Sequence, residues 1–140
     1  MISDADLAGY QARAHGKKIV PGQTKKNGVP ISEPEEQLAW QLTGAGITYY
    51  RNFPFHPTRK WTADFVILPP RAKDPVLLVE CEGRGRHQSI PGFEADIEKY
   101  TEAMLLGYVV LRFVPRQIAS GKALGWIMKL LAKKERNNRA

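Results

Sequence analysis

The segment VECEGRGRH, at residues 79–87, places two carboxylates at the end of an apolar run, followed by a glycine, two arginines and a histidine. Glu80 and Glu82 are two positions apart, and Asp64 lies in another apolar segment, TADFVIL. Because successive residues of a strand point to opposite faces, Glu80 and Glu82 should share one face while Cys81 points away. If the two segments pair as strands, Asp64 approaches Glu80.

Carboxylates gathered in an otherwise apolar sheet are costly unless a cation lies between them. A hard divalent cation accepts one or two carboxylates and completes its shell with waters and phosphate oxygens. We therefore expect Asp64 and Glu80 to bind Mg²⁺ or Mn²⁺, in a site that acts on a phosphate.

Basic and aromatic residues stand on both sides of these carboxylates. One group precedes Asp64 in the segment HPTRKW, and the other follows Glu82. Lys and Arg with an interleaved aromatic suit phosphate contacts and base stacking, although either group alone is equally typical of a charged turn. The candidate DNA-binding residues are Arg59, Lys60, Trp61, Arg84 and Arg86.

Seven segments have the pattern of a helix or a strand. The first is a helix in ISEPEEQLAWQLTGAGI, where Ser32 and Glu35 have the spacing of a capping box and Pro34 fits the first turn. Three segments rich in β-branched and aromatic residues predict a meander of strands, of which the third is apolar enough to be central. A helix, a fourth strand and a last amphipathic helix follow. The six later segments are ITYYRNFPF, TADFVIL, VLLVECEG, FEADIEKYTEAMLLG, YVVLRFVP and SGKALGWIMKLLAKKERNNRA.

The resulting order, αβββαβα, predicts an α/β fold with a mixed four-stranded sheet flanked by helices. In the second helix, apolar residues recur at about 3.6-residue spacing, at Phe93, Ile97, Tyr100 and Met104. Gly107 is expected to end this helix.

A chain of 140 residues, 43% of them hydrophobic, is typical of one globular domain. Its one cysteine, Cys81, excludes an internal disulfide and a multi-cysteine zinc site. No apolar run reaches the roughly 20 residues that span a bilayer, and the first residues lack the pattern of a leader peptide. We therefore expect a cytoplasmic protein that has no membrane partner.

The net charge of +7 is concentrated at the two ends of the chain. Residues 1–30 carry +3 and residues 129–140 carry +4, while the charges between them cancel. Basic ends suit DNA, because phosphate contacts release counterions and supply affinity for any sequence. The same ends could instead be solubilising tails.

Taken together, the motifs resemble the PD-(D/E)XK nuclease superfamily over about residues 32–130. TADF matches the aspartate motif and VECEG matches the second acidic motif. The further segments EPEEQL, DIEKY and GYVVLRF, with His87, look most similar to a branch that includes the very-short-patch mismatch repair endonucleases and phage-type nuclease-like proteins. The resemblance implies a restriction-endonuclease-like core, metal-dependent hydrolysis of DNA phosphodiester bonds, and the homodimer that small nucleases often use to cut both strands.

The chain departs from the superfamily pattern at Glu82, which stands where a lysine handles the attacking water. Two residues could supply that role: Lys99, since the superfamily can relocate its lysine to this helix, and His87, whose imidazole titrates near neutrality. Glu82 itself could be a second metal ligand or the partner of a neighbouring arginine. Glu35 matches the acidic first-helix residue that many of these nucleases place near the metal, although its capping role also explains it.

On this interpretation, residues 1–30 are a flexible basic arm, residues 31–132 a nuclease-like domain and residues 133–140 a basic tail. Two alternatives to an enzyme remain. The chain could be a nuclease-fold DNA-binding module that has lost catalysis, which Glu82 favours, or an interaction protein whose basic ends dock a partner.

Overall fold

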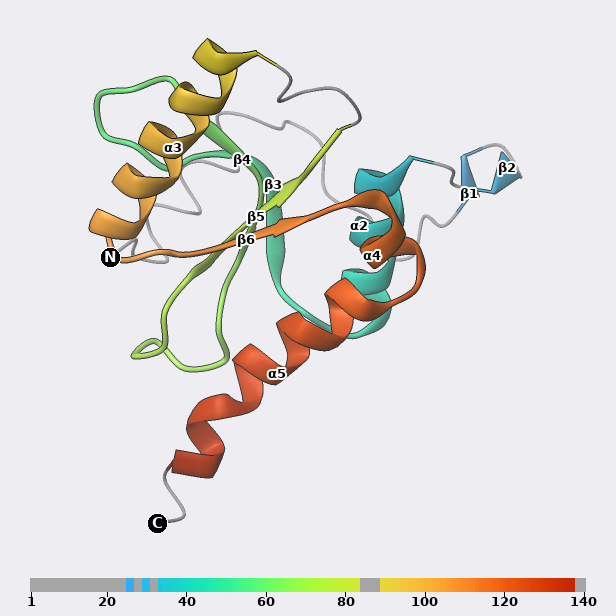
Figure 1. Cartoon of the computed structure of the whole chain (residues 1–140). Coiled ribbons are helices and arrows are strands. Elements are labelled where there is room, and N and C mark those ends of the chain that lie inside the picture. Colours follow the sequence, from blue (N-terminus) through green and yellow to red (C-terminus); the bar gives the residue numbers. More distant parts are fainter. Residues whose placement is uncertain (1–24, 27–28, 31–32, 84–88, 138–140) are drawn as a thin grey trace.

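The computed structural model of the chain describes residues 25–26, 29–30, 33–83 and 89–137 (Figure 1). The predicted order of helices and strands is confirmed, with two additions: a pair of two-residue strands before the first helix, and a short helix, α4, before the last one. The elements are β1 (Lys25–Lys26), β2 (Val29–Pro30), α2 (Pro34–Gly44), β3 (Tyr49–Pro54), β4 (Thr62–Ile67), β5 (Leu77–Cys81), α3 (Ile90–Leu105), β6 (Val109–Phe113), α4 (Pro115–Ala119) and α5 (Lys122–Asn137).

The four-stranded sheet is mixed and open, in the order β3-β4-β5-β6. The first three strands form an antiparallel meander, and β6 runs parallel to β5 after the crossover through α3. All five residues of β5 are buried, which confirms the prediction that the third strand is central. Strand β1 pairs with β2 inside the segment predicted to be an arm, and α5 continues into the stretch predicted to be a tail.

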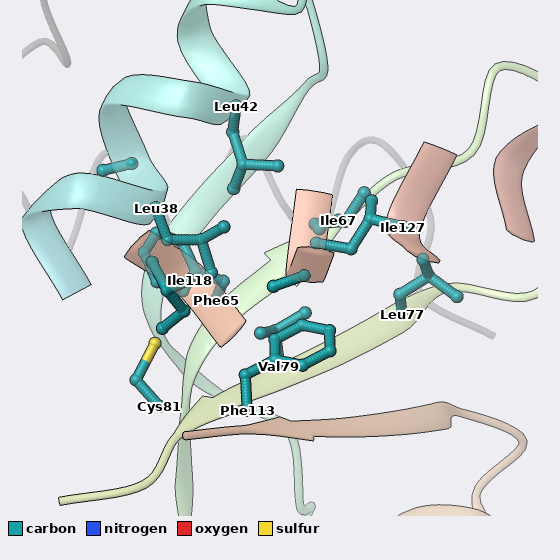
Figure 2. Close-up of a cluster of buried hydrophobic side chains, with 12 residues drawn as sticks. Leu38, Leu42, Phe65, Ile67, Leu77, Val79, Cys81, Phe113, Ile118 and Ile127 are labelled. Atoms are coloured by element: carbon teal, nitrogen blue, oxygen red, sulfur yellow. The ribbon is translucent and has the colours of Figure 1, made fainter. Parts of the chain in front are cut away.

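The helices cover the two faces of the sheet unequally (Figure 1). On one face, side chains of α2, α4 and α5 pack with alternate residues of the strands, in a cluster that includes Leu38, Phe65, Val79 and Ile127 (Figure 2). On the other face, α3 contributes Ala103 to a second cluster. The region covered by α3 is where the polar groups described below lie.

The first helix begins differently from the prediction. Helix α2 starts at Pro34 with Glu33 at its N-cap, and no side chain caps it. Ser32, the predicted capping residue, lies outside the described residues, and the carboxylate of Glu35 binds an arginine of β3. Glu35 therefore faces the sheet, where it can take part in a site.

Helix α3 turns its apolar stripe outward. Phe93, Ile97 and Met104 are 57%, 50% and 56% exposed, and Ala103 is the helix's one buried residue. Part of the face toward the sheet is polar, because the ammonium of Lys99 reaches a strand glutamate there. The 3.6-residue period thus predicted the helix but not the face that it buries. None of the described helices has both the length and the hydropathy to cross a membrane.

Strand β3 contains one residue with a left-handed backbone, Asn52, at φ 52°. The register of β3 against β4 places Asn52 opposite Asp64, between the pairs Arg51 with Phe65 and Phe53 with Ala63. Asparagine tolerates this conformation better than most residues do. The distortion therefore lies directly beside the predicted aspartate of the site.

Replacing Asn52 with valine should lower the free energy of unfolding by roughly 1–2 kcal/mol, because a β-branched residue resists the left-handed conformation. Urea denaturation measures this change. Asn52→Gly is the matched control and should stay within about 1 kcal/mol of the parent protein, since glycine adopts positive φ without steric cost. A valine variant as stable as the glycine variant would show that the backbone at this position is not constrained.

Candidate active site

Asp64 lies on β4 at the point where the β4–β5 ladder ends. The last pair of that ladder is Phe65 with Val79. Beyond this pair, the two strands are joined by the Asp64 side chain, whose Oδ2 accepts a hydrogen bond of 2.7 Å from the backbone N–H of Cys81. The donor belongs to the peptide that joins Glu80 to Cys81. Asp64 is therefore held against the strand that carries the second acidic motif, as the strand pairing predicted.

Glu80 lies on β5 and is only 3% exposed to solvent. One of its carboxylate oxygens is 3.2 Å from the ammonium of Lys99, whose side chain is 16% exposed. A buried carboxylate is costly unless it is paired, and Lys99 supplies the pairing charge from α3. The structure thus brings Lys99, one of the two residues predicted to stand in for the superfamily's lysine, to Glu80.

Glu82 directly follows β5. Its backbone N–H donates a hydrogen bond of 2.8 Å to the carbonyl of Phe113. Its carboxylate accepts a hydrogen bond from Nε of Arg112, an arginine of β6. The sequence left Glu82 open between a metal ligand and the partner of an arginine, and in the structure it has an arginine partner. That partner comes from the adjacent parallel strand.

Glu35 lies on α2, and its side chain extends to Arg51 of β3. Its carboxylate is 3.1 Å from the guanidinium of Arg51, which also binds Glu36 at 2.6 Å. Burial raises the pKa of the Cys81 thiol, and the negative charges of Asp64, Glu35 and Glu80 raise it further. The positive charge of Arg51, the partner of Glu35, acts on the thiol in the opposite direction and lowers its pKa.

Cys81 belongs to the hydrophobic cluster on the face away from Glu80, as the alternation of β5 predicted (Figure 2). Because its pKa is raised, the thiol stays protonated at neutral pH, and the thiolate is the reactive form. We expect Cys81 to remain unmodified by a thiol-specific disulfide reagent at pH 8 in the native protein and to react fully in denaturant. Rapid labelling of the native protein would contradict this placement.

The HPTRKW loop packs against α3. The guanidinium of Arg59 lies 3.9 Å from the ring centroid of Trp61 and donates a hydrogen bond of 2.8 Å to Glu98. His56, in the same loop, lies 5.2 Å from the ring of Trp61 and 3.7 Å from the carboxylate of Glu102. Since the pair of Arg59 with Glu98 is solvent-exposed, it is worth about 1 kcal/mol at most, and a phosphate can compete for the arginine.

The remaining predicted residues differ in what the structure says of them. Lys60 is exposed. Arg84, Arg86 and His87 fall in residues 84–88, outside the described part of the chain.

The predicted metal site consists of two carboxylates. Within the described residues, no three His, Cys, Asp or Glu side chains come together as a metal-binding group. Two carboxylates are nevertheless within the number that Mg²⁺ takes from a protein, since it binds one or two and otherwise retains water or phosphate oxygens. The hydrogen bond from Cys81 occupies one oxygen of Asp64 and leaves further lone pairs on that carboxylate.

Two participants were not singled out from the sequence. Arg51 neutralises Glu35, and Arg112 neutralises Glu82. Each is a charged residue inside a segment of strand-forming residues, and this contrast could have indicated from the sequence that it has a partner in the site.

Comparisons with protein-family models, curated proteins and solved structures gave no match for this chain.

Proposed function

We propose that the chain is a metal-dependent DNA endonuclease related to the PD-(D/E)XK nucleases. The observation that carries the proposal is the cluster of Asp64, Glu80 and Lys99. The Asp64 carboxylate lies against the Glu80–Cys81 peptide, and the Lys99 ammonium lies 3.2 Å from the Glu80 carboxylate. Two acidic groups and one basic group from three different elements are the set that a phosphodiester hydrolase of this type requires.

In this proposal Asp64 and Glu80 would hold Mg²⁺ or Mn²⁺. When bound, the ion would supply Lewis-acid polarisation of a phosphate oxygen and lower the pKa of water. Lys99 would orient the attacking water, because its ammonium has three donors and Glu80 Oε1 takes only one. His87 stays the alternative for handling the proton.

DNA would be attracted by the basic side chains that flank the acidic residues in the sequence and by the ends of the chain. The candidates for phosphate contact are Arg59, Lys60, Arg84 and Arg86, with Trp61 packed beneath Arg59. The charges of +3 and +4 on residues 1–30 and 129–140 add attraction that is independent of sequence.

The proposal is tested by incubating the purified chain with supercoiled plasmid, branched DNA and mismatched duplex, each with Mg²⁺, Mn²⁺ or EDTA. We expect cleavage of at least one substrate with a divalent ion and none with EDTA. Intact DNA in every reaction, at protein concentrations where DNA is bound, would reject the enzyme.

A nuclease-fold module that binds DNA without cutting it is the second candidate. It is favoured by one observation: both glutamates of VECEG are neutralised by cations of the chain itself, Glu80 by Lys99 and Glu82 by Arg112. Calorimetric titration with Mn²⁺ separates the two candidates. A catalytic site binds the ion, whereas a degenerate site binds DNA and takes up no divalent ion.

A further inference from the structure

Arg112 stands beside the site although the sequence motifs did not point to it. In the parallel pairing of β5 with β6, Arg112 is the Cα partner of Glu80. Its guanidinium contacts Glu82, the residue that follows β5, and lies near Asp96 of α3, so it is on the face of the sheet that α3 covers. Lys99 approaches Glu80 from the same helix.

The guanidinium is held in one position by three groups. Its Nε donates to Glu82, and its centre lies 4.4 Å from the ring centroid of Tyr100. The carboxylate of Asp96 is 3.8 Å from Nη2, which is longer than a hydrogen bond. Stacking and a charge-assisted bond together restrict the side chain, so less entropy is lost when it binds a ligand.

The Arg112 side chain bonds Glu82 through Nε, which leaves the N–H donors of its two Nη groups available to a ligand. Arg112 is 42% exposed while Glu82 is 13% exposed, so the acid is the buried member of the pair and the arginine is the accessible one. Within the described residues, neither Nη group donates a hydrogen bond. A planar guanidinium with both Nη groups available matches two oxygens of a phosphate.

We propose that Arg112 binds a backbone phosphate of the DNA beside the Asp64–Glu80 pair, and that Glu82 is the positioning residue that holds its guanidinium. This inference rests on the proposed function, because it needs a nucleic-acid substrate. It also gives a reason for an acid at the position where the superfamily has lysine: the positive charge at this point comes from β6.

Salt dependence of DNA binding tests the contact without requiring cleavage. A fluorescein-labelled duplex is titrated by anisotropy in EDTA at several KCl concentrations. Each phosphate contact contributes about 0.9 to the slope of log K against log[KCl], so Arg112→Gln should reduce the slope by roughly that amount. Arg112→Lys should keep the slope but bind several-fold more weakly, because lysine lacks the planar fork.

Three further variants complete the test. Arg116→Gln removes an exposed charge from α4, on the other side of the sheet, and should leave the slope unchanged. Glu82→Gln should weaken binding at an unchanged slope, and Glu82→Asp should recover part of the loss, as expected of a residue that acts by positioning Arg112.

Each outcome decides the proposal. A parent-like slope for Arg112→Gln, or an equal loss in Arg116→Gln, overturns the Arg112 contact while cleavage by the parent chain keeps the endonuclease. Absence of DNA binding by the parent chain overturns both proposals. If Arg112→Gln fails to fold, Arg112→Lys decides, because parent-like affinity in that variant contradicts the bidentate contact.

Discussion

Replacing Asp64 with asparagine should weaken Mn²⁺ binding by at least about 10- to 100-fold, since even groups that only support a metal ligand are worth that much. Asparagine is the informative substitution because its side-chain oxygen can still accept the hydrogen bond from Cys81 N–H. The variant should therefore fold with the same β4–β5 geometry and lose the charge alone. Calorimetric titration with Mn²⁺ measures the effect.

The matched control is Glu94→Gln, which removes one exposed carboxylate from α3 and should bind Mn²⁺ as the parent chain does. Equal Mn²⁺ affinity in the Asp64→Asn variant and the parent chain would exclude Asp64 as a ligand. Equal weakening in both variants would indicate a general effect of net charge, not a site.

The second large effect concerns the stability of the chain. Lys99→Met should lower the free energy of unfolding by roughly 3–5 kcal/mol, because it removes the ammonium that pairs with the buried carboxylate of Glu80. The side chain of Glu80 is 4% exposed, so water cannot replace the lysine. Urea denaturation at pH 7 measures the loss.

The double variant Glu80→Gln with Lys99→Met separates this electrostatic cause from lost packing. With the buried charge removed as well, it should regain most of the stability lost in Lys99→Met, since a buried pair can often be replaced by uncharged groups at little cost. Effects of the two substitutions that simply add would contradict a direct pair between these residues.

Much of the arrangement followed from local patterns. The period of two predicted that Glu80 and Glu82 share one face while Cys81 points away into the core, and the structure confirms both. The meander and the crossover followed from strand composition and from the amphipathic helix between the third and fourth strands. Such features are set by residues near one another in the chain, so they can be read from the sequence.

Long-range pairing accounts for what could not be predicted. Arg112 reaches Glu82 only because β5 and β6 pair in parallel in one particular register, which no short segment specifies. Similarly, Arg59 was expected to be available to DNA, and in the structure it binds Glu98 across 39 positions of the chain. The outward stripe of α3 has the same origin, since the polar contacts of Lys99 lie on the face toward the sheet.

The most direct test of the central proposal compares the parent chain with Asp64→Asn on supercoiled plasmid, branched DNA and mismatched duplex, in Mg²⁺ and in EDTA, after both proteins have been shown to have the same unfolding midpoint. A metal-dependent endonuclease that uses Asp64 predicts cleavage of at least one of these substrates, only by the parent chain and only in Mg²⁺. All three substrates intact with both proteins, or equal cleavage by both, would contradict it.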